Sequence, residues 1–80
     1  MNISQAVATR IRELLKQNKM TQYKLEQISG LSHDTIKSIM KGKAKGVNLR
    51  TLILISYGFG ISVVEFLNCD LFNYENLNID

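Results

Sequence analysis

The sequence predicts an all-α domain made of five short helices. Its 80 residues contain no proline, and its apolar residues, mainly Leu and Ile, recur at the three- and four-residue spacing of amphipathic helices. A Ser, Thr or Asn precedes each helical stretch, and such side chains accept hydrogen bonds from the free backbone N–H groups of a first turn. A chain of this length forms one domain with a small core, so we expect a binding module rather than a catalytic cleft between domains.

The first helix is predicted over residues 3–18, with Asn2 as its cap and Gln5, three residues later, as a variant of the capping box. Its apolar stripe consists of Ile3, Val7, Ile11, Leu14 and Leu15. The remaining surface is basic, and Arg10 is expected to be a solvated charge rather than a phosphate contact.

Two short helices joined by a tight turn are predicted between Met20 and Gly42. Thr21 caps the first helix and Ser32 caps the second, with Gly30 between them. Apolar residues flank each cap at the spacing of a hydrophobic staple, which fixes how the chain enters a helix: Met20 with Leu25, and Leu31 with Ile36.

The second of these helices has an apolar and a polar side. Ile36 and Ile39, with Met40 at the edge, share the apolar side, and the polar side carries His33, Asp34, Lys37, Ser38 and Lys41. Such groups suit the DNA major groove, where base edges offer donors and acceptors between flanking phosphates. The alternative is an ordinary solvated face, and periodicity alone favours that alternative.

A fourth helix is predicted from the cap Asn48 to Gly58–Gly60, and a fifth from a full capping box at Ser62 and Glu65 to about residue 68. Staples again flank both caps: Val47 with Leu52, and Ile61 with Phe66. The fourth helix is apolar on more than one side, so it either lies at the centre of the core or is shared with a partner.

The tail, residues 69–80, alternates Phe72, Tyr74, Leu77 and Ile79 with Asn, Asp and Glu. Four apolar side chains are rarely left exposed without a reason. They either pack back on the domain or onto a second subunit, and we slightly favour the second subunit. The predicted dimer contact consists of these four residues together with Leu49, Ile53 and Tyr57 of the fourth helix.

Charge is unevenly distributed along the chain. Residues 1–60 hold all ten Lys and Arg against Glu13, Glu26 and Asp34, a balance of +7, whereas residues 61–80 hold four acidic residues, a balance of −4. A basic body attracts a polyanion, and the acidic end is expected to lie away from it. The net charge of +3 is also compatible with a role in solubility alone.

Several classes of protein are disfavoured. The sequence has no apolar run of membrane-spanning length and no signal-peptide core, so we expect a cytoplasmic protein. Cys69 is the single cysteine, which rules out an internal disulfide and a zinc site, and we expect it to be a half-buried structural thiol. The single histidine, His33, has only the adjacent Asp34 beside it, which does not orient it for catalysis, so we expect no enzyme, cofactor or metal.

An ordered set of residues carries a resemblance to a known family: Gln22, Leu25, Gly30-Leu31-Ser32, Ile36, Ile39, Gly42, Leu52, Ile55, Gly60-Ile61-Ser62 and Phe66-Leu67. Through these residues, the range 3–68 resembles the Cro/CI-type (XRE family) helix-turn-helix domain of phage repressors. The resemblance implies a five-helix lambda-repressor-like DNA-binding domain over residues 1–68, followed by the tail. It also implies a recognition helix whose N-terminal residues reach base edges while the first motif helix crosses the DNA backbone.

The resemblance further implies the contacts with double-stranded DNA. Bases are expected to meet His33, Asp34, Lys37 and Ser38, and phosphates are expected to meet Gln22, Lys41, Lys43 and Lys45. The implied function is a sequence-specific transcriptional regulator, most simply a repressor that binds a palindromic operator as a homodimer. The alternative is a protein-interaction module, for instance an antitoxin-like protein whose partner binds the acidic tail or the exposed side of the fourth helix.

Two departures from the family pattern stand out. Many relatives have a buried Arg–Glu ion pair at the positions of Leu15 and Met40, and replacing both members with apolar residues can be neutral or stabilising because two desolvation penalties disappear together. Relatives usually have Ala at the position of Glu26. Either the two motif helices lie slightly apart here, or the Glu26 side chain runs along their contact and reaches solvent.

Overall fold

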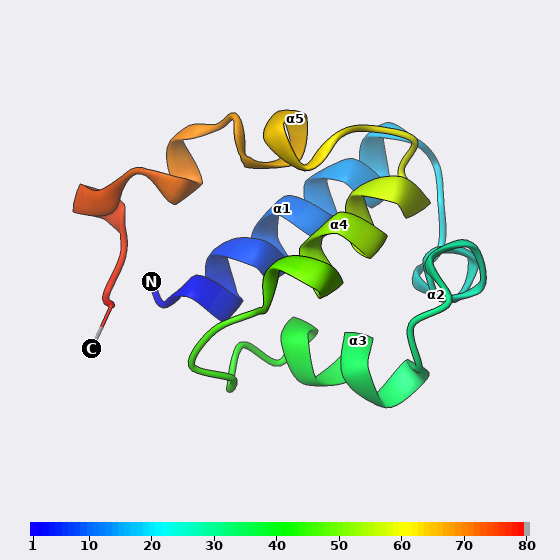
Figure 1. The fold of residues 1–80 in the computed structure, drawn as a ribbon, viewed down its shortest axis with the longest axis horizontal. Coiled ribbons are helices and arrows are strands. Elements are labelled where there is room, and N and C mark those ends of the chain that lie inside the picture. The colour runs from blue at the N-terminus through cyan, green and yellow to red at the C-terminus, as the bar shows by residue number, and fades with distance from the viewer. Residues whose placement is uncertain (80) are drawn as a thin grey trace.

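The computed structural model describes residues 1–79 and consists of α-helices joined by short connections (Figure 1). The helices are α1 (Ile3–Gln17), α2 (Gln22–Ser29), α3 (His33–Met40), α4 (Leu49–Gly58) and α5 (Val63–Leu67), followed by the 3₁₀ turns η1 (Asp70–Phe72) and η2 (Tyr74–Asn76). The predicted all-α, five-helix class is therefore confirmed. Asp80, which was counted in the acidic end, lies outside the described residues.

Each helix begins directly after its predicted cap. The cap side chain accepts from the backbone N–H three residues later at all five helices: Asn2, Thr21, Ser32, Asn48 and Ser62. At α1 the capping box is complete, because the Gln5 carboxamide also accepts from the Asn2 N–H at 2.9 Å. A cap of this kind contributes about 1 kcal/mol to stability.

The full capping box predicted at α5 is only half formed. The Ser62 hydroxyl accepts from the Glu65 N–H at 3.1 Å, but in the described part of the chain the Glu65 carboxylate makes no return bond to the Ser62 N–H. The Glu65 side chain is exposed, so its carboxylate can be hydrated instead.

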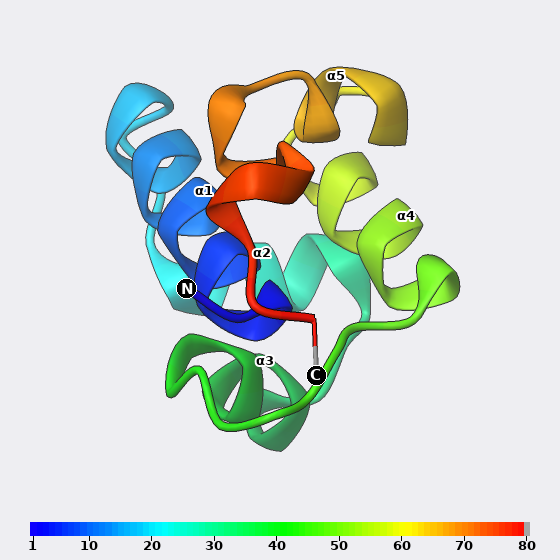
Figure 2. The same cartoon turned by 90° about the vertical axis from the view of Figure 1, so that its left-hand side faces the viewer.

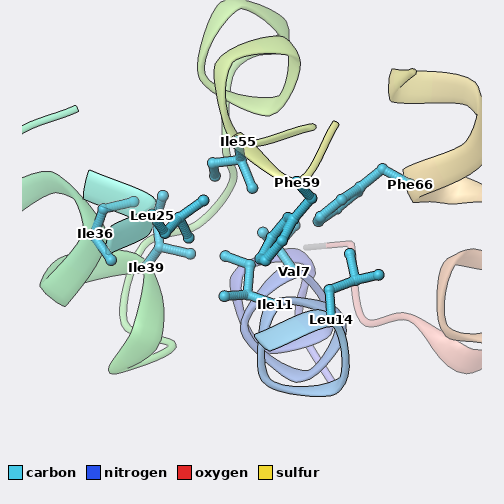
Figure 3. Close-up of a cluster of buried hydrophobic side chains, with 9 residues drawn as sticks. All are labelled: Val7, Ile11, Leu14, Leu25, Ile36, Ile39, Ile55, Phe59 and Phe66. Carbon is cyan, nitrogen blue, oxygen red and sulfur yellow. The ribbon is translucent and has the colours of Figure 1, made fainter. Parts of the chain in front are cut away.

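All five helices contribute to one core (Figure 3). Its buried members are Val7, Ile11, Leu14, Leu25, Ile36, Ile39, Ile55, Phe59 and Phe66. Half-buried staple residues pack around them, including Met20, Leu31, Val47, Leu52 and Ile61. Burial of each large apolar side chain contributes about 1.5–3 kcal/mol, so this cluster is the main source of the fold's stability.

Glycines permit a sharp turn and a close helix contact around α2. Gly30 ends α2 in the left-handed conformation, with φ at 76°, and its N–H donates to the Glu26 carbonyl at 3.0 Å. At Gly58 of α4, a Cβ atom would lie only 2.6 Å from Cδ1 of Leu25. The absence of a side chain at Gly58 therefore lets α4 support α2.

Arg10 is not the solvated charge that the sequence predicted. Its Nε donates to the Phe66 carbonyl at 2.7 Å and its Nη2 to the Glu65 carbonyl at 3.0 Å. Its guanidinium carbon also lies 5.9 Å from the centre of the Phe66 ring. The carbonyls at the end of α5 lack partners within the helix, and the packing of α5 near α1 brings Arg10 to them.

The tail folds back on its own domain (Figures 1 and 2). The Phe72 ring is half-buried, with its centre 6.1 Å from that of Phe66. Further along, the Asn78 N–H donates to the Met1 carbonyl at 2.9 Å and forms part of an isolated bridge with Asn2. Of the four tail residues predicted for the dimer contact, Leu77 is also half-buried. Within this single chain the tail therefore adopts the fold-back arrangement.

Two further expectations from the sequence concern the burial of Cys69 and membrane-spanning helices. Cys69 is half-buried, as predicted. Among residues 1–79, no helix has both the length and the apolar character needed to cross a membrane.

Candidate nucleic-acid interface

Helix α3 has the two-sided character that its sequence predicted. Ile36 and Ile39 are buried in the core, and Met40 is half-buried beside them. The opposite side is exposed and consists of His33, Asp34, Lys37 and Ser38, with the C-cap residue Lys41. Helix α3 lies at the edge of the molecule, so this polar side faces away from the core (Figure 1).

The N-terminal end of α3 is the end that a helix-turn-helix protein presents to bases. The Ser32 hydroxyl accepts from the Thr35 N–H at 3.1 Å and holds the first turn in place. His33 and Asp34 are the first two residues of the helix. A carboxylate in the first turn also interacts favourably with the helix dipole, which contributes about 0.3–1 kcal/mol.

The C-terminal end of α3 is tied to α1 by three side-chain donors. The Ser4 hydroxyl donates to the Ile39 carbonyl at 3.2 Å, and Nη2 of Arg12 donates to the Met40 carbonyl at 3.0 Å. Nδ2 of Asn2 donates to the Gly42 carbonyl at 3.1 Å. These bonds give partners to the last two carbonyls of α3 and to the Gly42 carbonyl just beyond it, and they fix the orientation of α3 on the domain.

The bonds from these three donors to the end of α3 were not predicted from the sequence, although one of the donors carries a detectable signal. Ser4 precedes Val7 by three residues, so it continues the apolar stripe of α1, and it is fully buried. A polar side chain on a buried stripe requires a hydrogen-bond partner. The pattern therefore indicates a buried contact at Ser4, but nothing local indicates that the partner is α3.

Two open grooves run along the exposed side of α3, and Asp34 and Ser38 line both of them. The first groove continues to Gly46, Val47, Asn48 and Thr51, at the start of α4. The second is lined by Lys37, Lys41 and Lys43. The structure thus brings three predicted base contacts together with two predicted phosphate contacts in the second groove, where clustered cations attract a polyanion.

The remaining two predicted phosphate contacts lie outside these grooves. Lys45 is exposed on the same loop as Lys43, between α3 and α4. Gln22 is the first residue of α2 and is half-buried. A side chain at a helix N-terminus lies beside free backbone N–H groups, which suit a phosphate oxygen.

Glu26 makes a direct contact with the first residue of α3. Its Oε2 lies 2.9 Å from Nδ1 of His33. The Glu26 side chain is only 12% exposed, while the imidazole is 66% exposed. One of the two sequence alternatives had the Glu26 side chain reach solvent. Instead, its carboxylate joins α2 to the start of α3.

At the other departure from the family pattern, the apolar replacement is accommodated by the core. Leu15 and Met40 are both half-buried and pack against the buried cluster. Helices α1 and α3, which carry them, lie in contact. No buried ion pair is needed to join these helices, because hydrophobic packing and the three side-chain donors of α1 connect them.

The predicted dimer residues occupy two different environments. Leu49, Ile53 and Tyr57 form an exposed stripe along α4, four residues apart, and Tyr74 and Ile79 of the tail are also exposed. Phe72 and Leu77 are half-buried within the same chain. Val64 of α5 is a further exposed apolar residue, which the sequence analysis did not include.

Comparison with known proteins identifies the family. A family model described as the Cro/C1-type HTH DNA-binding domain matches residues 10–71, well over half of the chain. Comparisons with curated proteins and with solved structures gave no match. The chain belongs to the Cro/C1-type helix-turn-helix family, whose members are DNA-binding domains rather than enzymes.

Proposed function

From the membership of the chain in this DNA-binding family, we propose that the protein is a sequence-specific transcriptional regulator. It acts most simply as a repressor that binds a palindromic operator as a homodimer. The observation that carries the proposal is the exposed side of α3, where His33, Asp34, Lys37 and Ser38 stand on a helix fixed at both ends. A protein with this role would act in the cytoplasm.

The proposed base contacts of three of these side chains, Asp34, Lys37 and Ser38, follow from their chemistry. Asp34 can accept from a cytosine amino group, and Lys37 can donate to O6 or N7 of guanine. Ser38 can both donate and accept. A bidentate pair would discriminate between bases by about 1–3 kcal/mol, and single hydrogen bonds by less.

The proposed phosphate contacts surround the base contacts. Gln22 would anchor the start of α2 to the DNA backbone, and Lys41, Lys43 and Lys45 would add charge along one strand. Phosphate contacts supply most of the affinity without reading sequence, whereas base contacts supply the specificity. In this proposal, residues 1–68 form the DNA-binding unit and residues 69–80 form a tail that contributes to pairing.

A dimer is proposed because one small domain covers too little DNA. A single module of this kind buries about 600–1,000 Å², which is too little for selective binding among many competing sites. The exposed stripe of Leu49, Ile53 and Tyr57 offers a surface for a second copy, with Phe72, Tyr74, Leu77 and Ile79 of the tail as further candidates. The same stripe supports the alternative function, a protein-interaction module such as an antitoxin-like protein.

Selection of bound duplexes from a random-sequence library tests the proposal. The wild-type protein should enrich a palindromic site, and Asp34→Ala or Lys37→Ala should change the bases preferred at defined positions of each half-site. Lys16→Ala, an exposed lysine of α1, serves as the charge-matched control for Lys37→Ala and should leave the preferred site unchanged.

Two results would contradict the proposal. If no duplex is enriched at low salt, the interaction-module alternative replaces DNA regulation. If a site is enriched but the Asp34 and Lys37 variants select the same site as the wild type, these residues do not read bases. Repression itself is tested by placing the selected site across a reporter promoter, where the protein should lower expression.

A further inference from the structure

The contact between Glu26 and His33 joins the first motif helix to the first residue of the recognition helix. Oε2 of Glu26 lies 2.9 Å from Nδ1 of His33, and among residues 1–79 this is the one close contact between a carboxylate and a basic side chain. Glu26 is largely covered by its surroundings at 12% side-chain exposure, so its carboxylate is held in place. The imidazole is 66% exposed, which leaves most of the ring accessible.

The chemistry of the two groups determines where the imidazole proton lies. An ionised carboxylate can only accept hydrogen bonds. Nδ1 must therefore carry a hydrogen and donate it to Glu26. In a neutral imidazole only one nitrogen carries hydrogen, so Nε2 has a free lone pair and is an acceptor. Free histidine in water prefers the opposite tautomer, with hydrogen on Nε2.

The free acceptor belongs to a side chain at the end of α3 that is proposed to meet DNA. Nε2 is the ring nitrogen that the Glu26 contact leaves free, the His33 side chain is 66% exposed, and His33 is the first residue of α3, where a recognition helix reaches base edges. In the major groove, hydrogen-bond donors are the exocyclic amino groups of cytosine (N4) and adenine (N6). A neutral His33 in this tautomer fits these amino groups and does not fit guanine, which offers only acceptors there.

We propose that Glu26 is a specificity-determining positioning residue, which selects the tautomer of His33 so that Nε2 accepts from the amino group of cytosine or adenine. The inference rests on the proposed function, because it requires α3 to enter the major groove. Glu26 itself does not touch DNA in this arrangement. Its effect is transmitted through the imidazole, in the way that a second hydrogen bond sets the tautomer of a histidine in other sites.

A purely structural role for Glu26 makes a different prediction. A carboxylate near the N-terminus of α3 also interacts favourably with the helix dipole, and it would then support the turn between α2 and α3 without affecting base choice. In that case, removal of Glu26 would weaken binding to all duplexes by the same factor and would leave the relative preference among bases unchanged.

The first test needs no DNA. Nitrogen-15 NMR of the labelled imidazole distinguishes the two tautomers, and at about pH 8, where an ordinary histidine is neutral, His33 of the wild type should show hydrogen on Nδ1. Glu26→Ala should return the ring to the Nε2–H form that free histidine prefers. Glu13→Ala, which removes an exposed carboxylate from α1, should leave the wild-type signal unchanged. A wild-type ring with hydrogen on Nε2 would overturn the proposal.

The second test measures base preference on the selected operator. At the half-site position where His33→Ala loses discrimination, the wild type should prefer cytosine or adenine over guanine. Glu26→Ala and the isosteric Glu26→Gln should reduce this preference by about 3- to 10-fold, the value of one hydrogen bond. Glu26→Gln keeps the shape of the side chain but its amide can also donate to Nδ1, so this variant relaxes the tautomer without leaving a cavity.

The outcomes separate this inference from the proposed function. Failure of the wild type to bind any duplex would reject the function and, with it, the base-reading role of His33. Sequence-specific binding in which the Glu26 variants keep the wild-type base preference would reject the inference alone. A preference for guanine at the His33 position at about pH 8 would also reject it, because guanine requires a donor.

Discussion

The two arginines of α1 satisfy backbone carbonyl groups at the ends of other helices. Arg10 binds the carbonyls of Glu65 and Phe66 in α5, and Arg12 binds the carbonyl of Met40 in α3. Helix ends leave such groups without partners inside the helix. A planar guanidinium with several donors can reach two carbonyls at once, so Arg10 connects the first helix to the last.

We expect Arg10→Met to lower the free energy of unfolding by about 2 kcal/mol, because two hydrogen bonds to a charged group are lost while an aliphatic stem is retained. Arg50→Met, at an exposed position of α4, should change it by less than about 0.5 kcal/mol. Urea denaturation of both variants measures the difference. Equal effects would show that Arg10 is only a surface charge.

Residue-scale prediction from the sequence succeeded where the relevant information is local. The exposed positions of α3 follow from the 3.6-residue period of one helix. The role of Arg10 could not be predicted in this way, because its partners are 55 and 56 residues away. Every residue has a backbone carbonyl, so the sequence does not indicate which carbonyls lie near Arg10. The same holds for the Glu26–His33 contact, which depends on the angle between two helices.

At the scale of helices, the C-terminus of α1 contains a local strain. Lys19 follows the C-cap with φ at 49°, and it is the one residue other than glycine with a positive φ in the described chain. Its N–H bonds the Lys16 carbonyl at 3.3 Å, and the Met20 N–H bonds the Leu15 carbonyl at 2.9 Å. These two bonds form a Schellman motif, in which glycine is the usual residue at this position.

Lys19→Gly should therefore raise the free energy of unfolding by about 0.5–1 kcal/mol. The left-handed conformation costs an L-residue about 1–2 kcal/mol, and the greater entropy of glycine in the unfolded chain offsets part of that gain. Lys19→Ala removes the same charge but keeps a Cβ atom, so it should give no comparable increase. Thermal unfolding of both variants measures the effect, and equal stabilisation would attribute it to charge instead.

The loop between α3 and α4 carries Lys43 and Lys45, both exposed. If each neutralises one phosphate, replacing either by Ala should weaken binding to operator and to unrelated duplex by the same factor. It should also reduce the slope of log K against log salt by about 1. Titrations at several salt concentrations measure this slope, with Lys16→Ala on α1 as the control. A loss limited to the operator would make the lysine a base contact.

Helix boundaries were predictable because their determinants lie within a few residues of each helix end. The five caps are short polar side chains that bond the backbone three residues ahead, and this geometry is set by local sequence. For the tail, the sequence allows two arrangements and slightly favours contact with a second subunit over folding back. The fold-back arrangement of the tail depends on the contact of Phe72 with Phe66 and on the pairing of Asn78 with Asn2. Neither contact is indicated by the sequence around these residues.

At the scale of the whole molecule, the acidic turns of the tail lie apart from the candidate interface on α3. The turns η1 and η2 hold Asp70 and Glu75, and Figure 1 shows these turns on a different side of the domain from α3. The chain beyond them returns to the N-terminus, where Asn2 contacts the Gly42 carbonyl at the end of α3. The acidic turns are thus separated from the candidate interface, although the last described residues approach its edge.

The size of the domain is compatible with a dimer on DNA. Its longest dimension is 32 Å, and two domains side by side could place their α3 helices about 34 Å apart, one helical turn of DNA. Pairing through the α4 stripe of Leu49, Ile53 and Tyr57 would be isologous, with the same surface on both copies. The tail contributes less exposed apolar surface than its sequence indicated, because Phe72 and Leu77 are half-buried.

We therefore expect the 9.1 kDa chain to sediment as a dimer at micromolar concentration, and Tyr57→Ser to shift it toward monomer and weaken operator binding. Tyr23→Ser is the matched control, because both tyrosines are 67% exposed and Tyr23 lies on α2. Tyr74→Ser tests the tail separately. If Tyr57→Ser has no effect while Tyr74→Ser gives monomers, the copies pair through the tail. A wild-type monomer at every concentration, with and without operator DNA, would reject the dimer and leave the α4 stripe to a different protein partner.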